Sequence, residues 1–288
     1  MTKIYNRSTK EYFETKDSFS LRFLYKSLPG RLILKGITHS AISKINGKIL
    51  SSKISKIIIK KFIQKNNIDM NDYPKEDYKS FNHFFVRKII PSKRIISTAN
   101  NDLISPADSK LMVYNITEEN KILVKNSIYT VLELIQDNRL AKEYQGGLCL
   151  VFRLSVEDYH HYVYIDDGES SKGTHISGIL HTVNPIAYKR YRVFKENSRE
   201  YTVLKTKNFG KVVQIEVGAL NVGKICNRQV KVFNKGDEKG YFEFGGSTII
   251  LLIKKDEVII DNDIIINSQK EIETIVKLGE VIGKKNKA

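Results

Sequence analysis

The chain has 288 residues, of which 41% are hydrophobic, and its formal net charge is +16. This length and apolar content allow one large domain with a packed core, or one domain with an appendage. No stretch approaches the ~18 apolar residues needed to span a bilayer, which excludes a helical membrane span. The first seven residues lack the apolar core of a signal peptide, so we expect a soluble or peripheral cytoplasmic protein.

The two cysteines, Cys149 and Cys226, lie in apolar, strand-like runs. No CxxC pattern or Cys/His spacing typical of a zinc site accompanies them. We therefore expect buried, reduced thiols and no metal centre.

The positive charge is concentrated near the N-terminus. Residues 18–68 contain eleven Lys or Arg and no Asp or Glu, whereas the seven Lys and seven acidic residues of 247–288 cancel. A basic excess confined to one region predicts a face that meets an anionic surface. General lysine-rich codon usage is the simpler alternative.

Residues 18–68 also have a helical, amphipathic pattern. One predicted face carries Ile54, Ile57, Ile58 and Phe62, and another carries Lys53, Lys56 and Lys60. Pro29-Gly30 and Asn46-Gly47 divide the stretch, so we expect two or three short helices. Large aliphatics between lysines suit the headgroup boundary of an anionic membrane. A core-packing helix with solvated lysines fits this pattern about as well.

After residue 104 the pattern changes to short apolar runs separated by turn residues, which predicts strands. The predicted strands are 148–156, 158–165, 175–183, 211–219, 230–233, 241–244, 248–253 and 257–260. A helix near 131–138 interrupts them, where Thr130 and Glu133 have capping-box spacing. We expect an α+β fold in which a basic helical layer (1–100) packs on a mostly antiparallel β body (101–288).

The tetrapeptide Gly245-Gly246-Ser247-Thr248 immediately precedes an aliphatic run. Two glycines allow a tight corner closed to residues with a Cβ, and the serine hydroxyl can reach the preceding carbonyl. Attack by Ser247 on the Gly246 carbonyl would give an ester. β-Elimination would then leave a dehydroalanine, which hydrolyses to a pyruvoyl group and ammonia. A Gly-Gly hairpin followed by a Ser-Thr turn is the simpler alternative.

Four further residues can supply acid–base chemistry: Asp108 in a turn, the adjacent His160 and His161, and His181. Each has a structural alternative, such as an Asx-turn for Asp108 or a packed strand histidine. Strand alternation sends His160 and His161 to opposite faces. Together with Ser247, this set matches a serine-type acyl transfer: a nucleophile, an imidazole base and an orienting carboxylate.

The motifs SPAD, FRLSVEDYH, VGALNVG and KGDEKGYFEFGGST, in this order, resemble phosphatidylserine decarboxylase proenzymes with a GGST processing site. FNHFFVRK resembles another element of that family, and the basic amphipathic start resembles its membrane-associating region. The resemblance runs from about residue 20 to the C-terminus. It implies cleavage between Gly246 and Ser247, a covalent pyruvoyl cofactor formed from Ser247, and two subunits, 1–246 and 247–288.

The resemblance also implies roles for individual residues. Asp108 matches the family's charge-relay aspartate, and His160 matches the first histidine of a DYHRxH pattern associated with decarboxylation. The second histidine, usually the base for self-cleavage, is replaced by Val163. His181 is our candidate for that base, because the turn at Asp166–Gly168 would fold its strand back toward 158–165. His161 is a poorer candidate because it should point away from His160.

The implied activity is decarboxylation of phosphatidylserine to phosphatidylethanolamine at the cytoplasmic face of the cell membrane. The pyruvoyl carbonyl would act as the electron sink, and no metal or added cofactor is implied. The resemblance leaves a homodimer open. Two alternatives remain: another pyruvoyl-dependent decarboxylase with a soluble amino-acid substrate, and a non-enzymatic basic module that binds nucleic acid through residues 18–68.

Overall fold

A long mixed sheet forms the centre of the molecule. The computed structural model describes residues 2–124, 127–188, 190–220, 224–245 and 247–287. All neighbouring strands of this sheet run antiparallel except β1 and β18. The spatial order is β14 (Val232–Phe233), β9 (Gly168–Ser170), β11 (Arg199–Thr206), β12 (Lys211–Val217), β16 (Ser247–Ile253), β7 (Leu148–Leu154), β4 (Ser109–Asn115), β18 (Glu273–Val276), β1 (Thr2–Asn6) and β2 (Glu11–Thr15), with β10 (Thr174–Ile176) beside β11.

In the described part of the chain, three smaller sheets accompany the main sheet. They consist of β13 (Ile225–Asn227), β15 (Glu238–Phe242) and β8 (His161–Val163); of β17 (Val258–Ile260), β19 (Val281–Lys285) and β3 (Asp102–Ile104); and of β5 (Lys121–Val124) and β6 (Ser127–Thr130). The expected α+β class with mostly antiparallel sheets is therefore confirmed.

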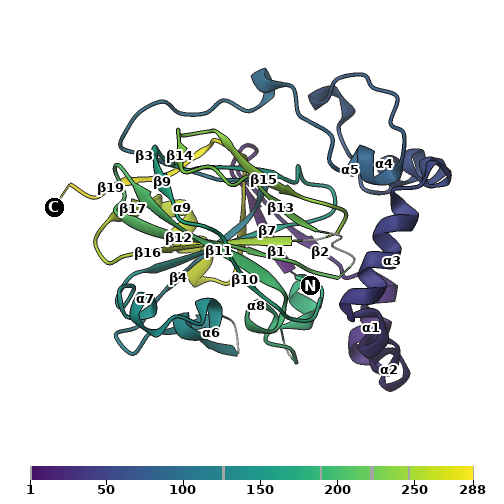
Figure 1. The fold of residues 1–288 in the computed structure, drawn as a ribbon, viewed down its shortest axis with the longest axis horizontal. Helices are drawn as coiled ribbons and strands as arrows, with labels where there is room; N and C mark the ends of the chain where they lie inside the picture. Colours follow the sequence, from purple (N-terminus) through teal and green to yellow (C-terminus); the bar gives the residue numbers. More distant parts are fainter. Residues whose placement is uncertain (1, 125–126, 189, 221–223, 246, 288) are drawn as a thin grey trace.

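Helices dominate the stretch predicted to be helical. They are α1 (Phe19–Lys26), α2 (Leu28–Ile37), α3 (Ser40–Leu50), the 3₁₀-helix η1 (Lys53–Ile58), α4 (Ile59–Lys65) and, further along, α5 (Phe81–Phe85). Ser18 and Ser27 begin α1 and α2 by accepting hydrogen bonds from backbone amides of the first turn. Figure 1 shows α1 to α5 along one side of the β body.

Short helices elsewhere connect the strands. They are α6 (Val131–Ile135), α7 (Asn138–Lys142), α8 (Val193–Glu196), α9 (Asn262–Gln269), and the 3₁₀ turns η2 (Met70–Asp72), η3 (Pro91–Lys93) and η4 (Pro185–Ala187). The capping box predicted for Thr130 and Glu133 is present at the start of α6.

Several predicted strands are shorter or paired differently. Of the run 158–165 only 161–163 are in a strand, and of the run 175–183 only 175–176, which end β10. β10 pairs with β11, so its chain does not fold back onto β8 as we expected. Residues 2–15, for which no strand was predicted, form a hairpin whose first strand lies parallel to β18. Such a pairing depends on a partner at the other end of the chain, which local pattern does not reveal.

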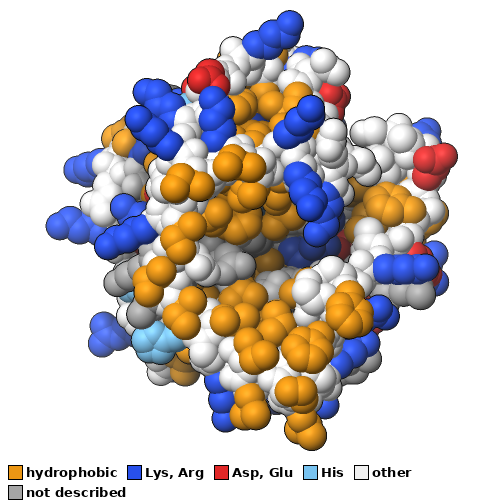
Figure 2. Space-filling model, turned by 90° about the vertical axis from the view of Figure 1, so that its right-hand side faces the viewer, with side chains coloured by type: hydrophobic (Ala, Val, Ile, Leu, Met, Phe, Trp, Pro, Cys, Tyr) orange, Lys and Arg blue, Asp and Glu red, His pale blue; other side chains and the backbone are white. Residues whose placement is uncertain are grey.

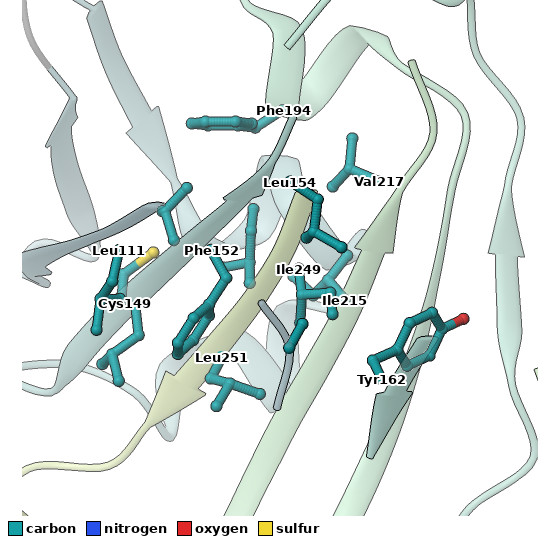
Figure 3. Close-up of a cluster of buried hydrophobic side chains, with 14 of the residues drawn as sticks. Leu111, Cys149, Phe152, Leu154, Tyr162, Phe194, Ile215, Val217, Ile249 and Leu251 are labelled. Atoms are coloured by element: carbon teal, nitrogen blue, oxygen red, sulfur yellow. The ribbon is translucent and has the colours of Figure 1, made fainter. Parts of the chain in front are cut away.

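Strand β16 lies at the centre of the main sheet, between β12 and β7, and all of its residues are buried. Its register places Ser247 opposite Leu154, and Ile249 opposite Phe152. Ser247, Ile249 and Leu251 therefore share one face of the sheet, and Thr248 lies on the other face. Figure 3 shows Leu154, Phe152, Ile249 and Leu251 packed together at this centre.

Exposed apolar side chains gather on the helical side of the molecule, as Figure 2 shows. The large exposed hydrophobics between residues 19 and 58 are Phe19, Phe23, Leu28, Leu32, Ile33, Ile45, Ile49, Ile54, Ile57 and Ile58. Ile54 and Ile57 are 78% and 81% exposed, whereas Phe62 packs against the core. The change from a 3₁₀-helix to an α-helix at Ile59 breaks the single predicted face. Within the described residues, no helix has the length and apolar content that crossing a membrane requires.

Candidate active site

Ser247 is the first residue of β16, and its side chain is fully buried. Its Oγ has no hydrogen-bond partner among the described residues. Two residues earlier, Gly245 has a φ of 137°, in a region that residues with a Cβ rarely adopt. Gly246 lies outside the described residues. Ser247 is therefore a buried hydroxyl that forms no hydrogen bond with any described residue.

His160 immediately precedes β8 and is in contact with aromatic rings. Its ring centroid is 4.3 Å from that of Phe85, which lies 5.1 Å from the ring of Phe244. Nδ1 lies 2.8 Å from the carbonyl oxygen of Asp158. Because a carbonyl can only accept, Nδ1 must carry the proton of the neutral ring, and Nε2 then carries a lone pair.

The Nε2 atom of His160 is buried and, like Ser247 Oγ, has no partner among the described residues. Burial lowers the pKa of His160 to about 3, because the charged ring would lose its hydration. The imidazole is therefore neutral at physiological pH, with an unoccupied acceptor. Such a group can accept a proton from a nearby hydroxyl.

His161 has a structural role. Its ring stacks between Tyr159 and Tyr241, and its Nε2 lies 2.9 Å from the Val86 carbonyl oxygen. Its Nδ1 lies 3.1 Å from a carboxylate oxygen of Glu238. Both ring nitrogens of His161 face described protein acceptors, unlike Nε2 of His160.

His181 belongs to a different aromatic cluster, beside helix α1. Its ring centroid is 3.9 Å from that of Tyr191, and its Nδ1 is 3.4 Å from the Tyr25 hydroxyl. The side chain of Asn197 bonds to both the backbone N–H and the carbonyl of His181. Burial lowers the pKa of His181 to about 4. The strand pairing that we expected to bring His181 toward 158–165 is absent, so that premise is wrong.

Asp108 is buried and bound to cations. Arg94 donates to its two carboxylate oxygens at 2.8 and 2.6 Å, the backbone N–H of Leu278 donates at 2.8 Å, and Lys277 Nζ lies at 3.5 Å. Burial alone would raise the pKa of Asp108, but Arg94 and Lys277 hold it below the ordinary value. No imidazole is among its described hydrogen-bond or ion-pair partners. Asp108 instead links the large predicted subunit to Leu278 of the small one.

A pocket of about 540 Å³ lies next to the segment that precedes Ser247. Phe244 and Gly245, next to the predicted cleavage site, form part of its wall. The other lining residues are Thr2, Ile4, Phe13, Thr15, Lys16, Asp17, Leu21, Lys110, Arg153 to Asp158, Thr182 to Pro185, Leu220, Ile275 and Lys277. The described pocket is therefore large enough for a small polar group and its apolar attachment.

Sequence reasoning assigned no role to the buried charges of this pocket. Lys110 Nζ lies 2.8 Å from Glu157 and 2.6 Å from Asp158. Arg153, opposite Lys110 across β4 and β7, makes a two-pronged ion pair with Glu273. Burial alone would lower the pKa of Lys110, but the carboxylates of Asp158 and Glu157 raise it. The sequence did contain a signal for these buried charges, because Lys110 and Arg153 lie within otherwise apolar strands.

Comparison with known proteins defines the class of this chain. Residues 81–284 match the model of the phosphatidylserine decarboxylase family. A phosphatidylserine decarboxylase proenzyme 2 from Clostridium acetobutylicum is 54% identical, with 98% of each chain covered. Proenzymes from Ruminiclostridium cellulolyticum and Fusobacterium nucleatum are each 42% identical, over 98% and 92% of this chain and 97% and 90% of their own.

The chain therefore belongs to the phosphatidylserine decarboxylase family and is a carboxy-lyase. Its reaction is the decarboxylation of phosphatidylserine to phosphatidylethanolamine. The expectation drawn from the sequence motifs is confirmed at this level.

Proposed function

We propose that the chain cuts itself between Gly246 and Ser247 and then decarboxylates phosphatidylserine at a membrane surface. One observation carries this proposal: Ser247 Oγ and His160 Nε2 are both fully buried, and neither has a partner in the described structure. Burying a polar atom without a hydrogen bond costs roughly 1–3 kcal/mol, so such atoms commonly mark a functional site.

In the proposed cleavage, Ser247 Oγ attacks the carbonyl carbon of Gly246 while His160 Nε2 takes its proton. The C–N bond to Ser247 breaks, its nitrogen is protonated, and an ester forms. Elimination then removes the Cα proton of residue 247 and breaks its Cβ–Oγ bond, which forms the Cα=Cβ double bond of a dehydroalanine and releases the carboxyl end of residues 1–246. Addition of one water and loss of ammonia leave a pyruvoyl group at position 247.

The residues present fit this group. It would begin the buried strand β16, two residues after Gly245, which lines the pocket. A pyruvoyl carbonyl supplies an electron sink for the loss of CO₂. The protein's own contribution is to bind the headgroup in the pocket and to keep bulk water from it. The buried Lys110 and Asp158, together with the partly exposed Glu157, form the polar wall of the pocket.

For the histidines, the geometry favours a revised division of labour. We propose that His160 performs proton transfer during both cleavage and decarboxylation. His181 remains a candidate for either step, but its contacts with Tyr25 and Tyr191 also suit a positioning role, because Thr182 to Pro185 line the pocket. Asp108 acts by anchoring Arg94 and the segment that begins at Leu278.

We further propose that helices α1 to α4 form a basic layer that docks on an anionic membrane at the cytoplasmic face. The exposed aliphatic and aromatic side chains of residues 19–58 could enter the headgroup boundary, surrounded by lysines and arginines (Figure 2). Each basic residue near an anionic surface contributes ~1 kcal/mol, which salt weakens.

Intact-mass spectrometry of the purified protein tests the cleavage. We expect two pieces, the smaller beginning at position 247 with a blocked, ketone-bearing terminus. Ser247→Ala should remain uncut and inactive, and Ser247→Cys should cut slowly because a thiol can make the same acyl shift. A fully active chain that stays intact at 33.1 kDa would contradict the proposal.

Gel separation of cut and uncut chains, combined with CO₂ release, tests the histidines. His160→Ala should accumulate uncut chain, and Asp108→Ala should do so as well because its anchor is lost. If His181→Ala blocks cutting while His160→Ala cuts normally but decarboxylates poorly, the division first expected from the sequence is correct and the revised one is wrong.

Sedimentation with anionic vesicles tests the membrane role. Binding should weaken at high salt and fall sharply when Lys53, Lys56 and Lys60 become Glu. Replacing the exposed Ile54 and Ile57 with Ser should also weaken vesicle binding when wild type and variant are compared at the same salt concentration. Unchanged binding in both variants would leave these helices without the proposed function.

A further inference from the structure

We infer that Lys277, with Lys16 as a second cation, binds the phosphodiester of the phosphatidylserine headgroup at the rim of the pocket. This inference rests on the proposed function, because it takes the pocket beside Gly245 as the headgroup site. It assigns a specificity role to two residues outside the proposed serine–histidine pair.

The lining of the pocket changes from apolar to polar. The apolar part of the lining consists of Ile4, Phe13 and Leu21. Leu21 belongs to helix α1, in which Phe19 and Phe23 are exposed. The other part of the lining contains Gly245 and the buried charged side chains of Lys110 and Asp158. A phospholipid would place its amine near Gly245 and its acyl chains over the apolar residues. Its phosphate must then lie between these two regions.

The buried cations of the pocket are already neutralised. Lys110 contacts two carboxylates, Glu157 and Asp158. The guanidinium of Arg153 is held by both oxygens of Glu273. Neither group offers an unmatched positive charge to a phosphate, so the anion requires another partner.

Lys277 belongs to a cluster with excess positive charge. Two carboxylates, Asp72 and Asp108, contact three cations, Lys93, Arg94 and Lys277. Arg94 takes both oxygens of Asp108 at hydrogen-bond distance, whereas Lys277 lies farther away at 3.5 Å. Among the described residues this cluster therefore has one more positive than negative charge, and Lys277 is its member that lines the pocket.

The exposure of Lys277 suits an incoming ligand. Its side chain is 46% exposed, so the ammonium can turn toward a bound anion without breaking a buried contact. Lys16, between β2 and α1, is also exposed and lines the pocket, and no ion pair joins it to another described residue. The two lysines come from opposite ends of the chain, and after cleavage they would belong to different subunits.

Two soluble analogues separate recognition of the phosphate from the rest of the reaction. Glycerophospho-L-serine carries the phosphodiester, whereas O-methyl-L-serine has the same amine and carboxylate without it. Lys277→Gln should lower kcat/KM for glycerophospho-L-serine about 10- to 100-fold, the range of a charge-assisted hydrogen bond, and change O-methyl-L-serine little. Lys277→Arg should recover most of the loss.

The matched control is Lys255→Gln, which removes the same charge from the small subunit at an exposed pair with Glu118. It should leave both analogues unaffected. An equal loss on both analogues in Lys277→Gln would show that the lysine acts through Asp108 or the fold, and would overturn the inference.

Binding to the uncut Ser247→Ala chain gives a readout independent of cleavage. Phosphorus NMR titration should show that glycerophospho-L-serine binds, and that Lys277→Gln weakens this binding while Lys255→Gln does not. If the wild-type chain fails to cut, the proposed function is contradicted, but the binding measured with the Ser247→Ala chain is unaffected. Equal binding by both variants would overturn the subsite, and equal affinity for inorganic phosphate would overturn its assignment to the lipid headgroup.

Discussion

The protonation states of His160 and His181 predict how the stability of the protein depends on pH. Burial holds the pKa of His160 at about 3 and that of His181 at about 4, compared with 6.5 for an exposed histidine. Both rings are therefore neutral in the folded protein near pH 5, where the unfolded chain binds a proton at each. Because the unfolded state binds more protons, the free energy of unfolding falls as the pH drops below 6.5.

The size of the effect follows from these values. Each pH unit below 6.5 costs about 1.4 kcal/mol per histidine, until the folded-state pKa is reached. Between pH 7.5 and pH 5.0 each ring should therefore cost about 2 kcal/mol, or about 4 kcal/mol together. The hydrogen bond from His161 lowers the pKa of Glu238 to about 2. Protonation of this carboxylate therefore reduces the free energy of unfolding only at still lower pH.

Urea unfolding of the uncut Ser247→Ala chain at pH 7.5 and pH 5.0 measures this loss. Adding His160→Gln should halve it, and adding His181→Gln as well should remove most of it. The difference between the two pH values cancels any pH-independent cost of the substitutions. A pH-dependent loss that His160→Gln leaves unchanged would show that this ring is not held neutral. It would also remove the physical basis for His160 as a proton acceptor.

Three further results are expected. Glu273→Gln leaves the Arg153 guanidinium buried without its counter-charge, so urea unfolding should show a loss of about 3–5 kcal/mol; a loss below about 1 kcal/mol would contradict this. Phe85→Ala removes the ring beneath His160 and should cost about 3–5 kcal/mol and slow cutting on a time-course gel, whereas normal cutting would mean that the ring does not position His160. After cleavage the two pieces should co-elute in native gel filtration and separate only in denaturant, because β16 pairs with large-subunit strands on both sides; separation without denaturant would contradict this pairing.

Local pattern in the sequence determined much of the fold. The apolar runs that became β7, β12 and β16, and the capping box of α6, depend on residues that are neighbours in the chain. The expectation of a corner at Gly-Gly-Ser-Thr is likewise local, because the conformational freedom of glycine is a property of the residue itself. Together with the order of the motifs, these features were sufficient to identify the family.

The tertiary structure decided which side chains meet. Strand β1 lies beside β18 only because the two ends of the chain come together, and Asp108 faces Arg94 and Lys277 instead of an imidazole. His160 differs from His161 through contacts with Phe85, Glu238 and the backbone, none of which strand alternation could reveal. A side chain's burial and its remaining hydrogen-bond capacity depend on segments distant in sequence. Periodicity therefore located the histidines, but only the packed molecule shows that Nε2 of His160 has no hydrogen-bond partner among the described residues.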